Sequence, residues 1–166
     1  MKDHSWSIWL NPCRKDRIKY HRIIYRNCKL YSTPIFEPHV TLFGRVDIAP
    51  YAVVEHIKEL SLHQERFILN TKGISLGLPP WKSLFIRLQG TKRLKKFQSG
   101  INQYLKKYKK YTFDPHLSLF YGKKKIKKTE IKGISVGETI EFSSVSLLYT
   151  SDIIDDWNVI EEFNLK

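Results

Sequence analysis

The chain contains 166 residues, of which 42% are hydrophobic and 13% aromatic, so it can bury a core and is not expected to be disordered. No stretch approaches the roughly 18 uninterrupted apolar residues of a bilayer-spanning helix, and residues 1–12 lack the apolar middle and cleavage site of a signal peptide. These features exclude a membrane protein. They predict one domain, 1–166, which we expect to be a cytoplasmic monomer.

Hydrophobic periodicity predicts strands and helices that alternate along the chain. The first strand, 5–11, ends at Pro12. Gly73 and Gly77 mark expected bulges within a later strand or bent pair of strands. In chain order, the predicted elements are a strand at 5–11, a helix at 14–30, a strand at 38–47, a helix that starts at Pro50, a strand or bent pair at 66–78, a strand at 83–89, a helix from Thr91 toward Lys110, a strand at 115–121, one or two strands within 131–150, and a strand at 157–165.

The spacing of these elements is irregular, which favours an α+β fold over a doubly wound parallel sheet. No linker rich in Gly, Ser or Pro separates two domains. If the chain divides into two lobes, the boundary is expected near the Pro79-Pro80 loop.

An internal repeat is the strongest signal in the sequence. Residues 36–43 (Phe-Glu-Pro-His-Val-Thr-Leu-Phe) align without gaps with residues 113–120 (Phe-Asp-Pro-His-Leu-Ser-Leu-Phe), 77 positions later. Five of the eight positions are identical, and the others exchange Glu for Asp, Val for Leu and Thr for Ser. The repeat indicates two halves built on one plan, each offering the same strand.

The spacing within each copy has a chemical meaning. Residues i and i+2 of a strand point to the same face, so His39 projects together with Thr41, and His116 with Ser118. If a pseudo-twofold axis relates the halves, these four polar groups converge, and we expect both histidines to face water. One neutral imidazole can take a proton from water while one imidazolium protonates a leaving oxygen. The hydroxyls can bind non-bridging phosphate oxygens, so the repeat predicts phosphoryl chemistry.

No metal or other cofactor is expected. Two imidazoles with two hydroxyls make a poor zinc shell, because no Cys or carboxylate completes it. Cys13 and Cys28 do not have the spacing of a zinc site, and we expect two ordinary thiols.

The paired His-x-Thr/Ser motifs resemble the signature of the two-histidine (2H) phosphoesterase superfamily. Within it, the chain is most similar to the cyclic phosphodiesterase family of plants and yeast. The resemblance covers nearly the whole length. Beside the two motifs, weaker similarities are found at 7–10 (Ser-Ile-Trp-Leu), 83–88 (Ser-Leu-Phe-Ile-Arg-Leu), 121–122 (Tyr-Gly) and 156–157 (Asp-Trp).

The resemblance implies two pseudo-twofold-related lobes, each with an antiparallel sheet and helices, around an active-site cleft. The catalytic positions of the family fall on His39 and His116. Its phosphate-binding positions fall on Thr41 and Ser118, and Tyr121 matches a tyrosine that lines the cleft. The implied reaction is metal-independent hydrolysis of a small cyclic phosphodiester to a phosphomonoester. Nucleoside 2′,3′-cyclic phosphates and ADP-ribose 1″,2″-cyclic phosphate are the implied substrates.

One stretch, 79–82 (Pro-Pro-Trp-Lys), departs from the family pattern. Trp81 within it either stacks on the base of a substrate or covers the core. We include it as a candidate substrate-binding residue.

The net charge of +13 leaves the size of the substrate open. Lysines gather at 92–110 and 123–128. Such charge attracts phosphorylated ligands, including RNA ends, yet lysine-rich faces are also ordinary solvated surface. Three alternatives therefore stand beside the small cyclic phosphate: RNA end processing or 2′-5′ RNA ligation, cleavage of cyclic oligonucleotide signals, and a non-catalytic RNA-binding module.

Overall fold

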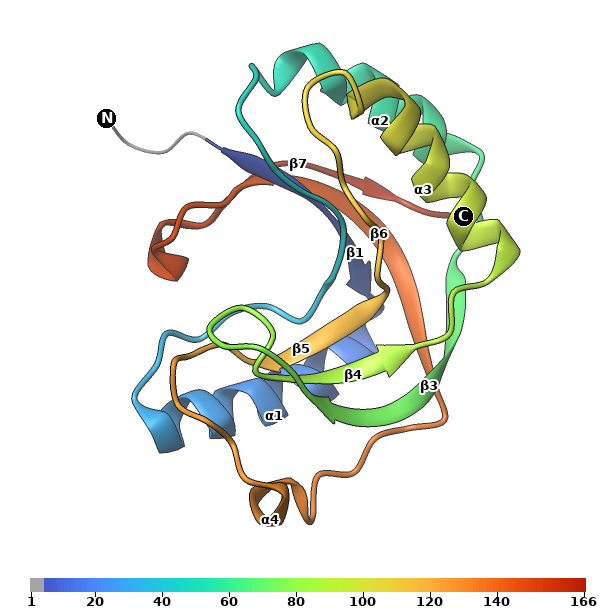
Figure 1. Ribbon diagram of the computed structural model, residues 1–166. Coiled ribbons are helices and arrows are strands. Elements are labelled where there is room, and N and C mark those ends of the chain that lie inside the picture. Colours follow the sequence, from blue (N-terminus) through green and yellow to red (C-terminus); the bar gives the residue numbers. More distant parts are fainter. Residues whose placement is uncertain (1–4) are drawn as a thin grey trace.

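The structure is a computed structural model that describes residues 5–166. Within this range the chain forms one seven-stranded antiparallel sheet with helices packed against it (Figure 1). In chain order the elements are β1 (Trp6–Pro12), α1 (Arg14–Tyr31), β2 (Val40–Val46), α2 (Tyr51–Leu62), β3 (Phe67–Leu76), β4 (Leu84–Leu88), α3 (Lys92–Leu105), β5 (His116–Phe120), α4 (Lys128–Ile131), β6 (Thr139–Tyr149), the 3₁₀ turn η1 (Ile154–Asp156) and β7 (Asn158–Asn164). The fold is α+β, as predicted.

The order of the strands brings the two halves of the repeat together. The path is β2-β1-β6-β3-β4-β5, and β7 pairs with the second half of β6. The two strands that carry the repeat, β2 and β5, therefore form the two ends of this path. Although four strands separate them along the sheet, they contact each other in space, so the sheet must curl back on itself.

A bend in β3 makes this curl possible. The first residues of β3 pair with β6 and the later ones pair with β4, with a shift in register between Thr71 and Ile74. Gly73 lies in this interval with a φ of 81°, a left-handed conformation that glycine adopts without steric cost. The bulge expected at Gly73 is thus present. In Figure 1 the green β3 joins the β1–β6–β7 part of the sheet to the β4–β5 part.

The helices pack against different strands of the sheet. Helix α1 packs against β5 and β1 (Figure 1). Helix α2 packs against β7, and α3 packs against β2. One lobe contains β4, β5 and the later residues of β3, and the other contains β1, β2, β6, β7 and the first residues of β3. The expected boundary near Pro79-Pro80 is wrong, because this loop connects β3 to β4 within the first of these lobes. The other lobe combines strands from both ends of the chain.

Helix α3 shows how burial decides where an element ends. Its N-cap is Thr91, as predicted, whose hydroxyl accepts a hydrogen bond from the Leu94 amide at 3.1 Å. The helix ends at Leu105 rather than near Lys110, because the following turn offers the core only lysines and an exposed Tyr108. The short helix α4 was not predicted, and the region 131–150 contains a single strand, β6. No helix within 5–166 is both long and apolar enough to cross a bilayer.

Candidate active site

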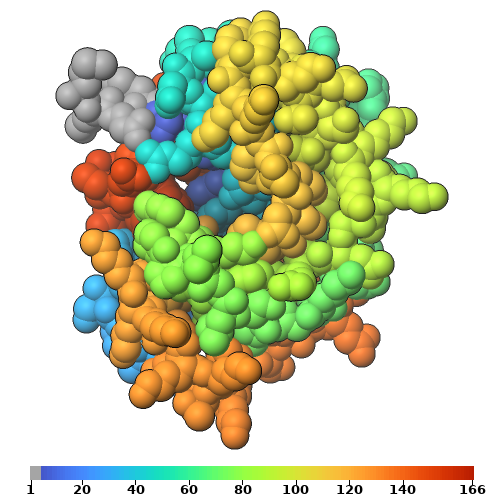
Figure 2. All heavy atoms as spheres, in the orientation of Figure 1, coloured from blue at the N-terminus to red at the C-terminus, as the bar shows by residue number. Residues whose placement is uncertain are grey.

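A cavity of about 300 Å³ lies where β2 and β5 approach each other. Figure 2 shows a hollow in this face of the molecule, with blue atoms of the N-terminal part at its bottom and cyan, green, yellow and red atoms around it. The cavity is lined by Ser7, Trp9, His39, Thr41, Gly44, Arg45, Trp81, Lys82, Tyr111, His116, Tyr121, Thr150, Ser151 and Trp157. Five of the six residues singled out from the sequence thus line one cavity; the sixth, Ser118, does not.

The two motif histidines are held in the same way. The Nδ1 atom of His39 lies 2.7 Å from the Glu37 carbonyl oxygen, and that of His116 lies 2.7 Å from the Asp114 carbonyl oxygen. A carbonyl oxygen only accepts hydrogen bonds, so both Nδ1 atoms carry a proton. In each neutral imidazole the free lone pair is therefore on Nε2. Both rings are prepared to exchange protons through Nε2.

The repeat extends to an aromatic partner for each histidine. Trp9 stands opposite the hydroxyl residue of the first motif in the β1–β2 pairing and stacks on His39, with ring centroids 3.4 Å apart and an interplanar angle of 5°. Phe85 stands opposite the hydroxyl residue of the second motif and contacts His116 edge-on, at 5.3 Å. These contacts fix the orientation of both imidazoles.

The His39 side chain is strongly desolvated. Its side chain is buried beneath Trp9, so the expectation that both histidines face water is wrong for this one. Burial lowers the pKa of His39 to about 3; the hydrogen bond to the Glu37 carbonyl opposes this shift, and the nearby His116 adds to it. His39 is therefore neutral at physiological pH, with Nε2 available as a proton acceptor.

His116 has a different environment. Burial lowers its pKa, and the hydrogen bond to the Asp114 backbone opposes this shift. The Lys82 ammonium also lowers the pKa of His116, whereas the Asp114 carboxylate, 3.9 Å from Nδ1, raises it. Lys82 and Asp114 form an ion pair, which lowers the pKa of Asp114. Unlike His39, His116 thus has a carboxylate beside it that can stabilise an imidazolium.

Replacing Lys82 should test this arrangement. Lys82→Met removes the cation that lowers the pKa of His116 and leaves the Asp114 carboxylate unpaired, so the pKa of His116 should rise. NMR titration of the imidazole resonances measures this change directly. The exposed Lys92, at the start of α3, provides the control Lys92→Met, which removes the same charge away from the cavity. An unchanged or lower pKa for His116 in Lys82→Met would show that the ion pair does not tune this group.

The hydroxyl groups of the two motifs, on Thr41 and Ser118, have different surroundings. Thr41 lines the cavity. Ser118 is buried, and its side chain hydrogen-bonds to the Tyr121 hydroxyl. The Tyr121 hydroxyl in turn lies 3.4 Å from His39 Nε2, and because burial raises its pKa to about 12, it is the donor in this contact. Ser118, Tyr121 and His39 thus form a chain of hydrogen bonds that links the two lobes.

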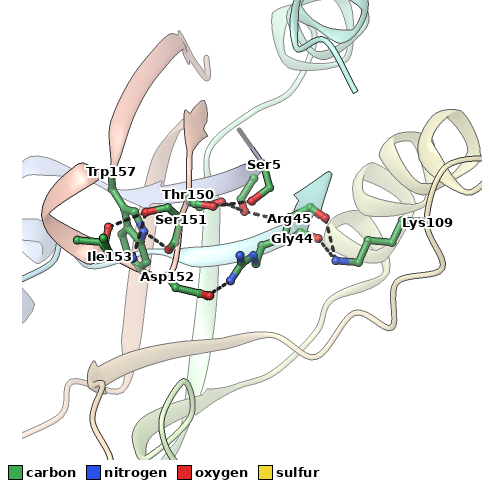
Figure 3. A network of polar contacts seen from close by, with 10 residues as sticks. Ser5, Gly44, Arg45, Lys109, Thr150, Ser151, Asp152, Ile153 and Trp157 are labelled. Atoms are coloured by element: carbon green, nitrogen blue, oxygen red, sulfur yellow. Dashed lines mark hydrogen bonds and ion pairs between the residues drawn. The ribbon is translucent and has the colours of Figure 1, made fainter. Parts of the chain in front are cut away.

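Arg45, which lines the cavity, and Lys109, which bonds to the adjacent backbone, form a basic rim on the β2 side. Arg45 has a φ of 53° at a break in the β1–β2 register, where its amide donates to Ser7 Oγ at 3.0 Å. Bulges of this kind redirect a side chain, and the Arg45 guanidinium pairs with Asp152 (Figure 3). Lys109 Nζ donates to the carbonyl oxygens of Gly44 and Arg45 at 2.9 and 2.8 Å (Figure 3). The rim would attract an anionic substrate.

Aromatic rings from both lobes meet over the cavity. Trp81 is 40% exposed and contacts Tyr121 edge-on, with centroids 5.7 Å apart. It also lies roughly parallel to Trp157, at 6.4 Å. The indole nitrogen of Trp157 donates to the Ser151 carbonyl oxygen at 2.8 Å (Figure 3). Trp81 is therefore a surface residue of the cavity and does not cover the core.

Several residues that line the cavity were not predicted from the sequence, including Trp9, Arg45, Lys82, Tyr111 and Trp157. Trp9 offered a signal, because it shares a strand face with the polar residues at positions 7 and 11. The others reach the cavity through a bulge or loops, which leave no periodic pattern. Among residues 5–166, no three His, Cys, Asp or Glu side chains are grouped closely enough to hold a metal ion.

The amino-acid sequence matches a known protein family. The sequence model described as "Cyclic phosphodiesterase-like protein" matches residues 4–165. The chain belongs to this family. The predicted membership of the two-histidine phosphoesterases is thereby confirmed, and the family indicates that the protein is a phosphoesterase. No curated protein sequence matches the chain significantly.

Solved structures with the same fold include TT0787 of Thermus thermophilus, with a TM-score of 0.67, 14% identity and 97% of each chain covered. LigT of E. coli in its apo form has a TM-score of 0.67, 14% identity and 98% of each chain covered. LigT complexed with 3′-AMP has a TM-score of 0.64, 9% identity and 98% of each chain covered. At these identities the likeness concerns the fold.

Proposed function

We propose that this protein hydrolyses a small cyclic phosphodiester, such as a nucleoside 2′,3′-cyclic phosphate or ADP-ribose 1″,2″-cyclic phosphate, to a phosphomonoester. The observation that carries the proposal is the convergence of His39 and His116 in one cavity, each with Nδ1 bonded to a backbone carbonyl. Membership of the cyclic phosphodiesterase-like family supports it. A cavity of about 300 Å³ suits a nucleotide-sized ligand.

The unequal surroundings of the two histidines suggest their roles. His39, neutral because it is buried, acts as the general base: once the attacking water replaces the Tyr121 hydroxyl at Nε2, His39 takes a proton from this water. The water oxygen bonds to phosphorus as one ring P–O bond breaks. His116, beside the Asp114 carboxylate, gives its Nε2 proton to the departing oxygen. Exchange with solvent then restores both protonation states.

The remaining residues are assigned to binding. Thr41 and Ser118 donate to the non-bridging phosphate oxygens, where transition-state charge resides. Ser118 must first exchange its bond to Tyr121 for one to the phosphate. Tyr121 and Trp81 contact the part of the substrate beyond the phosphate. Arg45 and Lys82 line the cavity and can donate hydrogen bonds to a phosphodiester anion, in exchange for part of their pairing with Asp152 and Asp114.

A substrate panel tests the proposal. We expect nucleoside 2′,3′-cyclic phosphates or ADP-ribose 1″,2″-cyclic phosphate to be hydrolysed in the presence of EDTA, because side chains supply the acid, the base and the anion donors. The panel also includes 3′,5′-cyclic nucleotides and RNA that ends in a cyclic phosphate. Turnover of the RNA alone would favour the RNA-processing alternative. Loss of activity in EDTA that a divalent ion restores would contradict the mechanism.

A further inference from the structure

A second cavity adjoins the first on the same concave side of the sheet. It measures about 170 Å³, and Trp9 and Trp157 line both cavities. An engineered protein cavity of about 150 Å³ holds benzene, so this space suits one planar ring system rather than a whole nucleotide. Since Trp9 stacks directly on His39 and also lines the second cavity, only this indole separates a ring bound there from the His39 imidazole.

The floor of this second cavity is unusually polar for a sheet that packs a core. Trp9 pairs with Ser146, Asn11 pairs with Ser144, and Ser146 pairs with Glu162, so all five residues share one face. Ser144 and Ser146 are almost fully buried. The Asn11 amide donates to Ser144 Oγ at 3.2 Å, to Ser146 Oγ at 3.0 Å and to Glu162 Oε1 at 3.4 Å. Ser144 Oγ donates to Glu162 Oε1 at 2.5 Å, so the floor is pre-organised around the carboxylate.

The charge of this floor selects the kind of ligand. Two carboxylates line the second cavity, and that of Glu37 is paired with Arg17 at 2.9 Å. The Glu162 carboxylate instead receives hydrogen bonds from Ser144 and Asn11. A carboxylate repels phosphate and accepts N–H donors. The apolar walls, which include Trp9, Trp157 and Phe36, suit the faces of a flat ring.

We propose that the second cavity binds the nucleobase of the substrate and prefers bases with an exocyclic amino group. This proposal rests on the proposed function of the adjoining cavity. The flat base packs against the aromatic walls and directs its amino edge to Glu162. Adenine and cytosine offer such an edge, whereas uracil presents a single N–H between two carbonyl oxygens, which the carboxylate repels.

Kinetics with three substrates test the preference: adenosine 2′,3′-cyclic phosphate, uridine 2′,3′-cyclic phosphate and glycerol 1,2-cyclic phosphate, which has no base. In Glu162→Gln, the ratio of kcat/KM for the adenosine substrate to that for the glycerol substrate should fall roughly tenfold, the usual effect of losing one charge-assisted hydrogen bond. The same ratio for the uridine substrate should not fall and is expected to rise, because the substitution removes the charge that repels the uracil carbonyl oxygens. Glu161→Gln is the matched control. Glu161 lies opposite the buried Leu147, on the other face of the sheet from Glu162, and does not line the cavity.

An unchanged adenosine ratio in Glu162→Gln, or an equal fall in Glu161→Gln, would overturn the proposal. If none of these three substrates is hydrolysed, and ADP-ribose 1″,2″-cyclic phosphate is not hydrolysed either, the proposed function is overturned instead. In that case NMR titration with free adenosine tests whether the second cavity binds a nucleobase. Adenosine should shift the Asn11 side-chain amide and the Trp9 indole resonances, and Glu162→Gln should weaken this binding. Shifts absent from both groups would reject the base site.

Discussion

His39→Ala and His116→Ala are each expected to lower kcat on a 2′,3′-cyclic nucleotide by roughly 10²–10⁴-fold, the usual contribution of a positioned acid or base. The double variant should fall well short of the product of the two losses, because the two histidines act as a unit. Thr41→Ala and Ser118→Ala should lose less, since each removes one neutral hydrogen bond while the proton transfers remain. Steady-state kinetics of the five variants measure these effects.

The controls must separate catalysis from folding. His39 is buried against Trp9, so His39→Ala also leaves a cavity, and His39→Asn, with a side-chain amide, is the better-packed partner variant. His56→Ala is the matched control, because His56 stacks on Tyr104 outside the cavity. Circular dichroism verifies the fold of each variant. A folded His39→Asn or His116→Ala protein with near-wild-type turnover would remove that residue from the mechanism.

Acid is expected to destabilise the protein through His39. Below about pH 6.5 the unfolded chain binds a proton at this imidazole, whereas the folded protein does not do so until the pH nears the lowered pKa of about 3. The contribution of His39 to the free energy of unfolding is therefore constant above about pH 6.5 and decreases by about 1.4 kcal/mol for each pH unit below it. By about pH 4.5 the loss from this single group should be about 3 kcal/mol.

Urea unfolding of the wild type and of His39→Asn at about pH 7 and about pH 4.5 measures this contribution. The variant lacks the titrating group, so its free energy of unfolding should decrease less between the two conditions. The comparison stops near pH 4.5 because Asp114, whose pKa is also lowered in the folded state, begins to destabilise the protein at lower pH. Equal decreases in the two proteins would show that His39 is not held neutral by burial.

The repeat explains why the centre of the site could be predicted from the sequence. Closely matching eight-residue frames at 36–43 and 113–120 specify the same strand twice, and the i, i+2 spacing places an imidazole and a hydroxyl on one face of each. The sequence does not show that β2 and β5 lie at opposite ends of one sheet path. Their meeting depends on the bend at Gly73, which was expected, and on the pairing of β6 with strands from both halves.

Other features of the site depend on contacts that no local pattern encodes. Trp9 reaches His39 because the β1–β2 register places it opposite Thr41. Arg45 reaches the cavity through a bulge in that same pairing. The hydrogen bond between Ser118 and Tyr121 likewise joins two residues whose separation of three gives no strand or helix signal here. Burial then makes two histidines in the same motif differ in acidity, which the repeat alone would not suggest.

The most direct test of the central claim is ³¹P NMR of adenosine 2′,3′-cyclic phosphate with the wild-type protein in ¹⁸O-enriched water that contains EDTA. We predict conversion of the cyclic phosphate to a single phosphomonoester that carries one ¹⁸O atom, delivered by the water that His39 activates. The folded double variant of His39 and His116 should leave the cyclic phosphate unchanged over the same period. Equal conversion by the double variant, or a monoester without ¹⁸O, would contradict hydrolysis by the paired histidines.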